Sequence, residues 1–405
     1  MDKAKKIGIL TFHQSVNNGA VMQAYSLSKR LKQDFPDSVV EIIDYRMKCV
    51  EKAYSYNLKS YLKEGSLVGR GKKIVKFILN PLMFKRLNRR TEIFHQCINQ
   101  LPLSSMKIED GGMDEVIQYI NSNYDILIVG SDAIWNHVSR GFPNIYLPDC
   151  RVKCHKLSYA ASCYGMDFLK CSEQTRKTIG ESLNDFYAIG IRDDATRDFV
   201  EWSGCTVTPY HTCDPTAFLD VDDLPVDVEK LEEKLKKKGF SFDKETIGIM
   251  GNEKMLKMLR SFYDKKYQLV SLYNYLPGAD VQLYDLTPYE WAYVFRYFKL
   301  TFTTYFHGTM LSLRNGTPLI CIALNTEFSK KHTPKTLDLL KRVGFEDWYF
   351  ETDYKTVNFK EIKEKADFLI SSNMKTKIIE AIEAEALSYR EFEKNLRKLM
   401  NSKEK

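Results

Sequence analysis

Short apolar runs of strand length alternate with amphipathic stretches along most of this chain. Residues 6–12 form the first run, the polar turn 17–19 follows, and apolar side chains then recur at helical spacing as far as Leu31. The further runs that predict strands are 39–45, 125–129, 156–161, 188–191, 246–250, 268–273, 300–304 and 318–323. This alternation predicts an α/β fold of doubly wound parallel sheets, in which functional loops gather at the carboxyl ends of the strands.

The alternation stops and restarts in the middle of the chain. Asp214 and Pro215 break the pattern, and the polar stretch 220–238 separates two cycles of strands and helices. A charged pattern with helical periodicity closes the chain and offers apolar side chains that could pack back on the first lobe. The predicted units are an N-terminal Rossmann-like lobe over 1–213, a C-terminal Rossmann-like lobe over 214–350 and a helical tail over 351–405.

The composition fits two packed lobes. The chain has 405 residues, of which 44% are hydrophobic and 13% are aromatic. The apolar run 7–12 is too short for a signal peptide, and no run approaches the roughly 18 to 20 apolar residues of a membrane helix. The nine cysteines are scattered and odd in number, which is typical of reduced thiols. We therefore expect a cytoplasmic protein.

Positive charge is concentrated in one segment. Residues 48–90 contain twelve Lys and Arg residues and two Glu residues, a net charge of +10, whereas the whole chain carries +7. Apolar residues are interspersed with these cations, which predicts a basic helical insertion at about 48–110. The insertion either packs on the first lobe with a solvated basic face or makes a peripheral contact with the anionic inner face of a membrane. We expect no nucleic-acid partner.

The first predicted strand-end loop carries polar groups suited to a ligand. Asn17, Asn18 and Gly19 stand between a strand and a helix start, where side-chain amides and free backbone donors face the edge of the sheet. We interpret them as a ligand-holding turn. The alternative is that Asn18 only caps the helix while Gly19 relieves a tight turn.

The loop after the strand 125–129 offers a mixture typical of carbohydrate sites. Ser131 supplies a hydroxyl, Asp132 a carboxylate, Trp135 an indole ring and Asn136 an amide. Carboxylates and amides pair with sugar hydroxyls, and an aromatic ring can cover the apolar face of a sugar. We interpret these residues as a sugar-holding loop, with helix capping by Asp132 as the alternative.

His307 follows the apolar strand 300–304, and Gly308 and Thr309 then open a helix. The sequence therefore places an imidazole beside free backbone donors at a helix amino terminus, which is suited to phosphate binding. Imidazole can also move a proton near neutral pH. We interpret His307, Gly308 and Thr309 as a phosphate-binding and catalytic helix start.

Arg192 follows the predicted strand 188–191. An arginine fork suits a carboxylate or a phosphate, whose oxygens it can engage in pairs. An ion pair with Asp193 and Asp194, the next two residues, is the alternative.

Other catalytic patterns are missing from the sequence. Cys150, Cys154 and His155 have no matching second pair of ligands, which argues against a zinc site. The chain has neither a glycine-rich phosphate loop of the nucleotide-binding kind nor a serine nucleophile elbow. We therefore predict no metal and no cofactor.

Six short motifs, taken together and in order, resemble the polysaccharide pyruvyl transferase family from Ile7 to about Trp348. The motifs are Asn17-Asn18-Gly19-Ala20 with Gln23 and Ala24, Gly130-Ser131-Asp132 with Trp135-Asn136, Ser158-Tyr159-Ala160-Ala161-Ser162 with Gly165, Ile191-Arg192-Asp193, Asp214-Pro215-Thr216, and Phe306-His307-Gly308-Thr309. Each motif is weak alone, and their shared order is specific. Tyr305 and Ala133 depart from the residues that are common in the family.

The resemblance implies two Rossmann-like lobes in a glycosyltransferase-B-like arrangement. It also implies phosphoenolpyruvate as a co-substrate and, as the acceptor, a sugar of a cell-surface glycan such as an exopolysaccharide or capsule, or a lipid-linked precursor. By motif, Arg192 and His307 bind the donor. The acceptor then falls to the first lobe, with the candidate acceptor-binding residues Asn17, Asn18, Gly19, Ser131, Asp132, Trp135 and Asn136. Lys335 is the best match for the family's donor-binding lysine, with Lys330 and Lys331 as alternatives.

A reaction follows from these roles. C3 of phosphoenolpyruvate is protonated, and His307 would either supply that proton or assist the departure of phosphate, while Arg192 and Lys335 neutralise the carboxylate and the phosphate. Asp132 would orient or deprotonate a sugar hydroxyl that attacks C2. A second hydroxyl then closes a ketal, and phosphate is released. Two alternatives remain open: a nucleotide-sugar-dependent glycosyltransferase of the same fold, and a non-catalytic glycan-assembly protein.

Overall fold

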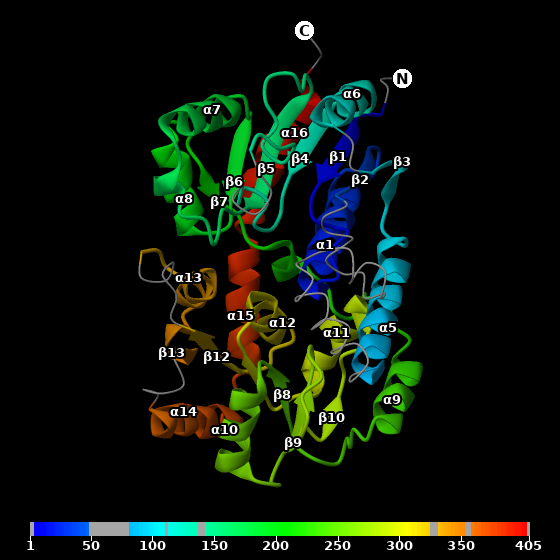
Figure 1. Ribbon diagram of the computed structural model, residues 1–405, viewed down its shortest axis with the longest axis vertical. Coiled ribbons are helices and arrows are strands. Elements are labelled where there is room, and N and C mark those ends of the chain that lie inside the picture. Colours follow the sequence, from blue (N-terminus) through cyan, green and yellow to red (C-terminus); the bar gives the residue numbers. More distant parts are fainter. Residues whose placement is uncertain are drawn as a thin grey trace, which may run out of the picture.

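The computed structural model has two α/β lobes, one above the other in Figure 1. The C-terminal helices run along both of them. The residues that the structure describes are 4–47, 81–109, 112–136, 142–324, 331–352 and 358–402.

The first lobe is built on a seven-stranded parallel sheet with the order β3-β2-β1-β4-β5-β6-β7. Its strands are β1 (Lys6–Leu10), β2 (Val39–Arg46), β3 (Leu103–Glu109), β4 (Ile126–Val129), β5 (His155–Ala161), β6 (Ala188–Ile191) and β7 (Tyr210–His211). Its helices are α1 (Asn18–Asp34), α5 (Pro81–Ile98), α6 (Met113–Asn123), α7 (Glu173–Asn184) and α8 (Asp194–Trp202). Every residue of β4 is buried, as expected for a central strand that is covered on both faces.

The second lobe repeats this architecture around a six-stranded parallel sheet with the order β10-β9-β8-β11-β12-β13. Its strands are β8 (Thr246–Met250), β9 (Gln268–Ser271), β10 (Val281–Gln282), β11 (Leu300–Thr303), β12 (Leu319–Leu324) and β13 (Tyr349–Thr352). Its helices are α9 (Val228–Lys237), α10 (Glu253–Tyr263), α11 (Pro288–Tyr293), α12 (Phe306–Arg314) and α13 (Lys335–Arg342).

Three helices close the chain: α14 (Phe359–Ser371), α15 (Lys375–Ala386) and α16 (Tyr389–Asn401). The first lies against the second lobe, where Tyr263 Oη donates a hydrogen bond to Asp367 Oδ1 at 3.0 Å. The last lies against the first lobe, where Tyr389 Oη donates to Asp34 Oδ2 at 2.7 Å. α15 runs between them, so the tail returns from the second lobe to the first (Figure 1).

Nine strand-like runs of the sequence correspond to β1, β2, β4, β5, β6, β8, β9, β11 and β12, which confirms the predicted doubly wound fold. Residues 103–109, expected within the helical insertion, form the edge strand β3 instead. Only Ser104 and Ile108 of that strand are fully buried, and its register with β2 shifts, so no alternating pattern marks it in the sequence. Residues 48–80 of the basic segment lie outside the described residues.

α5 continues the basic segment and extends beside the second lobe (Figure 1). It buries Phe84, Ile93 and Phe94, whereas Leu82 is 65% exposed. No helix within the described ranges is long and apolar enough to cross a membrane.

A buried charge cluster lies at the carboxyl ends of β1 and β2. His13 Nε2 donates a hydrogen bond to Asp44 Oδ1 at 2.9 Å, and Arg46 Nε donates to the same oxygen at 2.6 Å. Burial opposes the ionisation of Asp44, but the hydrogen bonds from His13 and Arg46 lower its pKa to about 2 from 3.8. The cluster therefore stabilises the ionised carboxylate.

Asp44→Asn is expected to lower the free energy of unfolding by about 2 kcal/mol at pH 7, which corresponds to this pKa difference. Because folding lowers the pKa of Asp44, its contribution is complete above pH 4 and is lost as the pH falls towards 2. Urea denaturation of both proteins from pH 2 to 7 should show a stability gap that narrows on acidification. A gap that does not change with pH would contradict the prediction.

Candidate active site

The candidate site lies where two topological switch points meet. The first sheet winds outward in both directions from β1 and β4, and the second sheet does so from β8 and β11. Open α/β sheets bind ligands at such points, outside the carboxyl ends of the strands. A cavity of about 140 Å³ is lined by loops from both points, with the residues Asn17, Asn18, Gly19, Asp132, Met250, Tyr273, Trp291, Tyr305, Phe306, His307 and Lys335.

The two lobes touch at His307 and Gly19. His307 is the second residue of α12, and Gly19 is the second residue of α1. A Cβ atom on Gly19 would lie only 2.0 Å from His307 Nδ1. The missing side chain at position 19 therefore lets the start of α1 approach the imidazole, which is 11% exposed.

Asp214 joins groups from both lobes behind the cavity. Its Oδ2 accepts hydrogen bonds from Gln23 Nε2 at 2.5 Å and Arg192 Nη1 at 3.0 Å, and lies 3.6 Å from His307 Nε2. Its Oδ1 accepts from the backbone N–H and the hydroxyl of Thr216. Burial opposes ionisation, but His307 and Arg192 hold the pKa of Asp214 well below its usual range. The carboxylate therefore balances the charge of Arg192 and lies beside the imidazole, whose Nε2 is buried without a hydrogen bond.

Sequence reasoning missed Asp214 as a site residue. In the sequence, Asp214 marks only a break between the lobes and part of a family-like motif. An Asp before a Pro, here Pro215, is typical of a turn and does not by itself indicate a site. The useful signal is that this motif immediately follows the last strand of the first sheet and so stands at the crossing between the lobes.

Arg192, expected to bind the donor, is 1% exposed and does not line the cavity. Its guanidinium carbon lies 4.8 Å from the ring centre of Phe306, which does line the cavity. Its closest carboxylate is Asp214, while Asp132 Oδ1 lies 3.7 Å and Asp193 Oδ2 lies 4.0 Å away. Arg192 Nε and Nη2 are buried without a hydrogen bond.

Lys335 lines the cavity, as the first residue of α13. Its ammonium lies 4.9 Å from the ring centre of Tyr164 and 5.3 Å from that of Phe306. Burial and the nearby Arg192 lower its pKa. Of the alternatives, Lys331 pairs with Asp167 at 2.9 Å, and residue 330 lies outside the described ranges.

Asp132 also lines the cavity, with its backbone in the left-handed region at a φ of 81°. Non-glycine residues in that region cost about 1 to 3 kcal/mol and cluster at functional sites. Its carbonyl accepts hydrogen bonds from the backbone N–H groups of Ile134 and Ser162, which fix this conformation. Burial opposes ionisation, but Lys335 and Arg192 lower the pKa of Asp132, so the carboxylate is ionised.

The rest of the predicted acceptor loop does not reach this cavity. Trp135 is 2% exposed, and its indole N–H donates to the carbonyl of Tyr146 at 3.0 Å in the core of the first lobe. Asn136 Nδ2 donates to the carbonyl of Tyr164 at 2.9 Å, and Ser131 is 1% exposed. A Trp after a strand looks the same in sequence whether it holds a sugar or fills a core.

The turn formed by Asn17, Asn18 and Gly19, the amide turn, does reach the cavity. Asn17 caps α1 through a hydrogen bond that its Oδ1 accepts from Gly19 N at 2.9 Å, and it also lines the cavity. Asn18 lines the cavity too, and its Oδ1 is buried without a hydrogen-bond partner. The amide turn can therefore cap α1 and still present side chains to the cavity.

Gly308 and Thr309 support the site from within the second lobe. A Cβ atom on Gly308 would lie 2.2 Å from Thr303 Oγ1, so glycine is required for α12 to pack on β11. Thr309 is fully buried, and its N–H donates to the carbonyl of Tyr305 at 3.1 Å. Tyr305, which departs from the family pattern, lines the cavity instead.

Known metal-binding arrangements are not found in the described part of the chain. No group of three or more His, Cys, Asp or Glu residues there is placed to hold a metal ion. Cys150 and Cys154 are free thiols.

Comparison with known proteins gives both a family and a fold. The family model described as polysaccharide pyruvyl transferase matches residues 17–326, which is most of the chain. No curated protein matches the sequence.

Among solved structures, UDP-GlcNAc 2-epimerase from Neisseria meningitidis, bound to UDP-GlcNAc, aligns over 97% of this chain and 100% of its own with a TM-score of 0.53 and 10% identity. UDP-GlcNAc 2-epimerase from Methanocaldococcus jannaschii aligns over 91% of this chain and 94% of its own with a TM-score of 0.50 and 9% identity. These likenesses agree with two Rossmann-like lobes in a glycosyltransferase-B-like arrangement.

Proposed function

This chain belongs to the polysaccharide pyruvyl transferase family, and we propose that it moves the pyruvyl group of phosphoenolpyruvate onto two hydroxyls of a glycan sugar. The product is a ketal, and phosphate is released. The observation that carries the proposal is the small cavity between the switch points, in which Lys335, His307 and Asp132 converge.

The cavity suits a small anion. Its volume of about 140 Å³ is well below the roughly 300 to 1,000 Å³ of sites for larger organic ligands. Lys335 supplies a cation, and the amino terminus of α12 adds backbone donors and a favourable dipole. Phosphoenolpyruvate presents a phosphate and a carboxylate to such groups.

We assign Arg192 a positioning role, because it is not among the residues that line the cavity and it donates a hydrogen bond to Asp214, whose carboxylate lies 3.6 Å from His307. Lys335 and His307 then contact the donor directly.

In the proposed reaction, the protonated imidazole of His307 gives its proton to C3 of phosphoenolpyruvate, and the enol electron pair forms the new C–H bond. C2 becomes oxocarbenium-like, and a sugar hydroxyl attacks it. The neutral imidazole then accepts the proton of that hydroxyl. The C2–O bond to phosphate breaks, a second hydroxyl attacks C2 to close the ketal, and its proton leaves with the phosphate.

Asp132 is better suited to orienting the hydroxyl than to deprotonating it. A general base works best when its pKa lies near the working pH, whereas the pKa of Asp132 is lowered. An ionised carboxylate nevertheless accepts a strong hydrogen bond from a sugar hydroxyl.

Purified protein incubated with phosphoenolpyruvate and a panel of neutral, nucleotide-linked and lipid-linked sugars should release phosphate and form a product heavier by one pyruvyl ketal. Phosphate release and product mass measure this directly. Millimolar phosphoenolpyruvate should also raise the melting temperature of the protein. Stabilisation by a nucleotide sugar and none by phosphoenolpyruvate would favour the glycosyltransferase alternative.

A further inference from the structure

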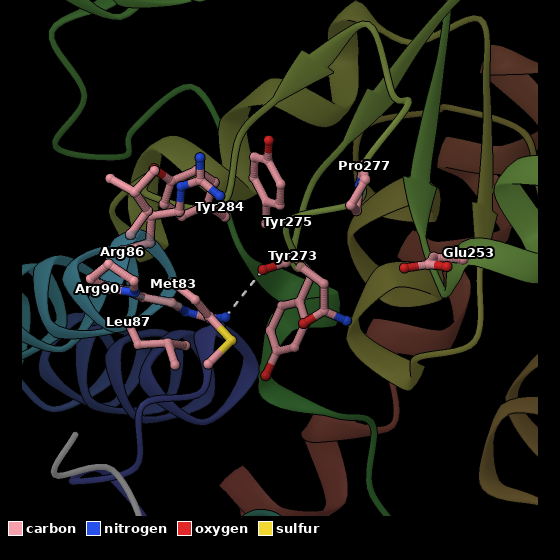
Figure 2. A pocket seen from close by; sticks show the side chains of 12 residues that line it. Met83, Arg86, Leu87, Arg90, Glu253, Tyr273, Tyr275, Pro277 and Tyr284 are labelled. Atoms are coloured by element: carbon pink, nitrogen blue, oxygen red, sulfur yellow. Dashed lines mark hydrogen bonds between the residues drawn. The ribbon is translucent and has the colours of Figure 1, made fainter. Parts of the chain in front are cut away.

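A second and larger cavity lies between α5 and the loop that follows β9, next to the candidate active site (Figure 2). Its volume is about 760 Å³, within the roughly 300 to 1,000 Å³ typical of organic-ligand sites. The described residues that line it are Pro81, Leu82, Met83, Arg86, Leu87, Arg90, Glu253, Tyr273, Asn274, Tyr275, Pro277 and Tyr284. Arginines, tyrosines and apolar side chains therefore share one cavity.

The two arginines are held in place by aromatic rings. The guanidinium carbon of Arg86 lies 3.7 Å from the ring centre of Tyr275, and that of Arg90 lies 4.2 Å from the ring centre of Tyr273. Arg90 Nη1 also donates a hydrogen bond to the carbonyl of Tyr273 at 3.1 Å, drawn as a dashed line in Figure 2. Cations fixed in this way lose little conformational entropy when an anion binds.

Arg90 is partly exposed, but one edge of its guanidinium lacks hydrogen-bond partners. Its Nε and Nη2 are buried and make no hydrogen bond. These two nitrogens form one edge of the fork, and that edge matches two oxygens of a phosphate group. Glu253 is the only carboxylate among the lining residues that the structure describes. An anionic ligand would satisfy the two donors.

The larger cavity adjoins the smaller one through shared aromatic residues. Tyr273 lines both cavities, and its ring centre lies 4.9 Å from that of Tyr305, which lines the smaller one. A ligand that places hydroxyls beside Asp132 can therefore extend past these two rings towards Arg90. The acceptor is the substrate with such an extension.

We propose that the larger cavity binds an organic diphosphate that joins the acceptor sugar to its carrier. The inference rests on the proposed function, because it requires the reacting hydroxyls of the acceptor to meet phosphoenolpyruvate beside Asp132, which lines the smaller cavity. Arg86 and Arg90 lie one helical turn apart, so each faces one phosphate of the pair. Leu82, Met83 and Leu87 and the tyrosines then surround the carrier. The acceptor is a sugar diphosphate rather than a neutral oligosaccharide.

Heat-shift titration of the full chain with inorganic pyrophosphate tests the cavity without knowledge of the acceptor. Arg90→Gln and Arg86→Gln are each expected to weaken pyrophosphate binding about tenfold or more, because each removes a charge-assisted contact. Arg89→Gln is the matched control, since Arg89 is on the same helix, is 64% exposed and does not line the cavity. Using both lining variants keeps the test valid if one of them fails to fold.

Heat-shift titration with phosphoenolpyruvate distinguishes a failure of the diphosphate site from a failure of the proposed function. Stabilisation by phosphoenolpyruvate should survive Arg90→Gln and be lost in Lys335→Gln, whereas stabilisation by pyrophosphate should survive Lys335→Gln. Equal pyrophosphate affinity in the wild type and both lining variants would overturn the diphosphate site and leave the proposed function standing.

Two further ligands identify the carrier. UDP should bind more tightly than pyrophosphate if a nucleobase stacks on the tyrosines, and geranyl diphosphate should do so if an isoprenoid packs on Leu82, Met83 and Leu87. Weaker binding of both than of pyrophosphate would overturn the assignment of an organic carrier to this cavity.

Discussion

Replacement of His307 by alanine is expected to lower the rate of pyruvyl transfer about 100-fold to 10,000-fold, which is the usual contribution of a positioned general acid. The imidazole lines the cavity, is 11% exposed and lies 3.6 Å from Asp214. The rate should be measured as phosphate release at saturating phosphoenolpyruvate. A large loss in kcat with a smaller change in KM is expected for a group that acts in the chemical step.

His155→Ala provides the matched control for this substitution, because His155 is exposed at the start of β5. Its activity should equal that of the wild type. If His307→Ala retained the wild-type rate, the proton-transfer role of His307 would be wrong, and the cavity would need another acid.

Gly19→Ala is expected to reduce activity about 100-fold or more with little loss of folding stability. The added methyl group would lie 2.0 Å from His307 Nδ1, so the imidazole or the start of α1 must move. A displacement of about 1 Å in an active site can cost about 100-fold in rate. Alanine is favourable in a helix, so the fold should tolerate the change. Phosphate release and thermal melting measure the two effects separately.

Gly112→Ala tests whether any glycine substitution near a helix start has this effect. Gly112 precedes α6, and no atom of the described residues lies within 4 Å of the place that an added methyl group would take. Its activity should not change. Equal activity of Gly19→Ala and the wild type would show that the contact between the lobes is not needed for the reaction.

The doubly wound architecture could be predicted because it depends on buried central strands. Such strands are continuous apolar runs, as in 126–129 and 246–250, and these runs can be recognised in the sequence. The edge strand Leu103–Glu109 could not be predicted, since most of its side chains are exposed. The boundary between α15 and α16 could not be predicted for another reason. Both helices are charged and amphipathic, and the residues between them, 387–388, include neither Gly nor Pro.

The candidate site was predictable in part. His307, Asp132 and the amide turn follow central strands, and parallel strands bring their carboxyl ends to one edge. The outcomes for Trp135 and Arg192 depend instead on side-chain direction, which a linear pattern does not contain. Trp135 fills a core, and Arg192 donates a hydrogen bond to Asp214 and does not line the cavity. The larger cavity depends on where α5 packs. Its hydrogen bond from Arg90 to Tyr273 joins segments about 180 residues apart in the sequence.

The C-terminal tail has a consequence for how the enzyme admits its substrates. The chain passes between the lobes at residues 213–214 and again between α15 and α16, and the two crossings are bonded where Cys213 N donates to Ser388 Oγ at 2.7 Å. Paired crossings favour rotation of the lobes about a shared hinge. Opening about that hinge would part Gly19 from His307, so the cavity that both residues line would be complete only when the lobes are closed.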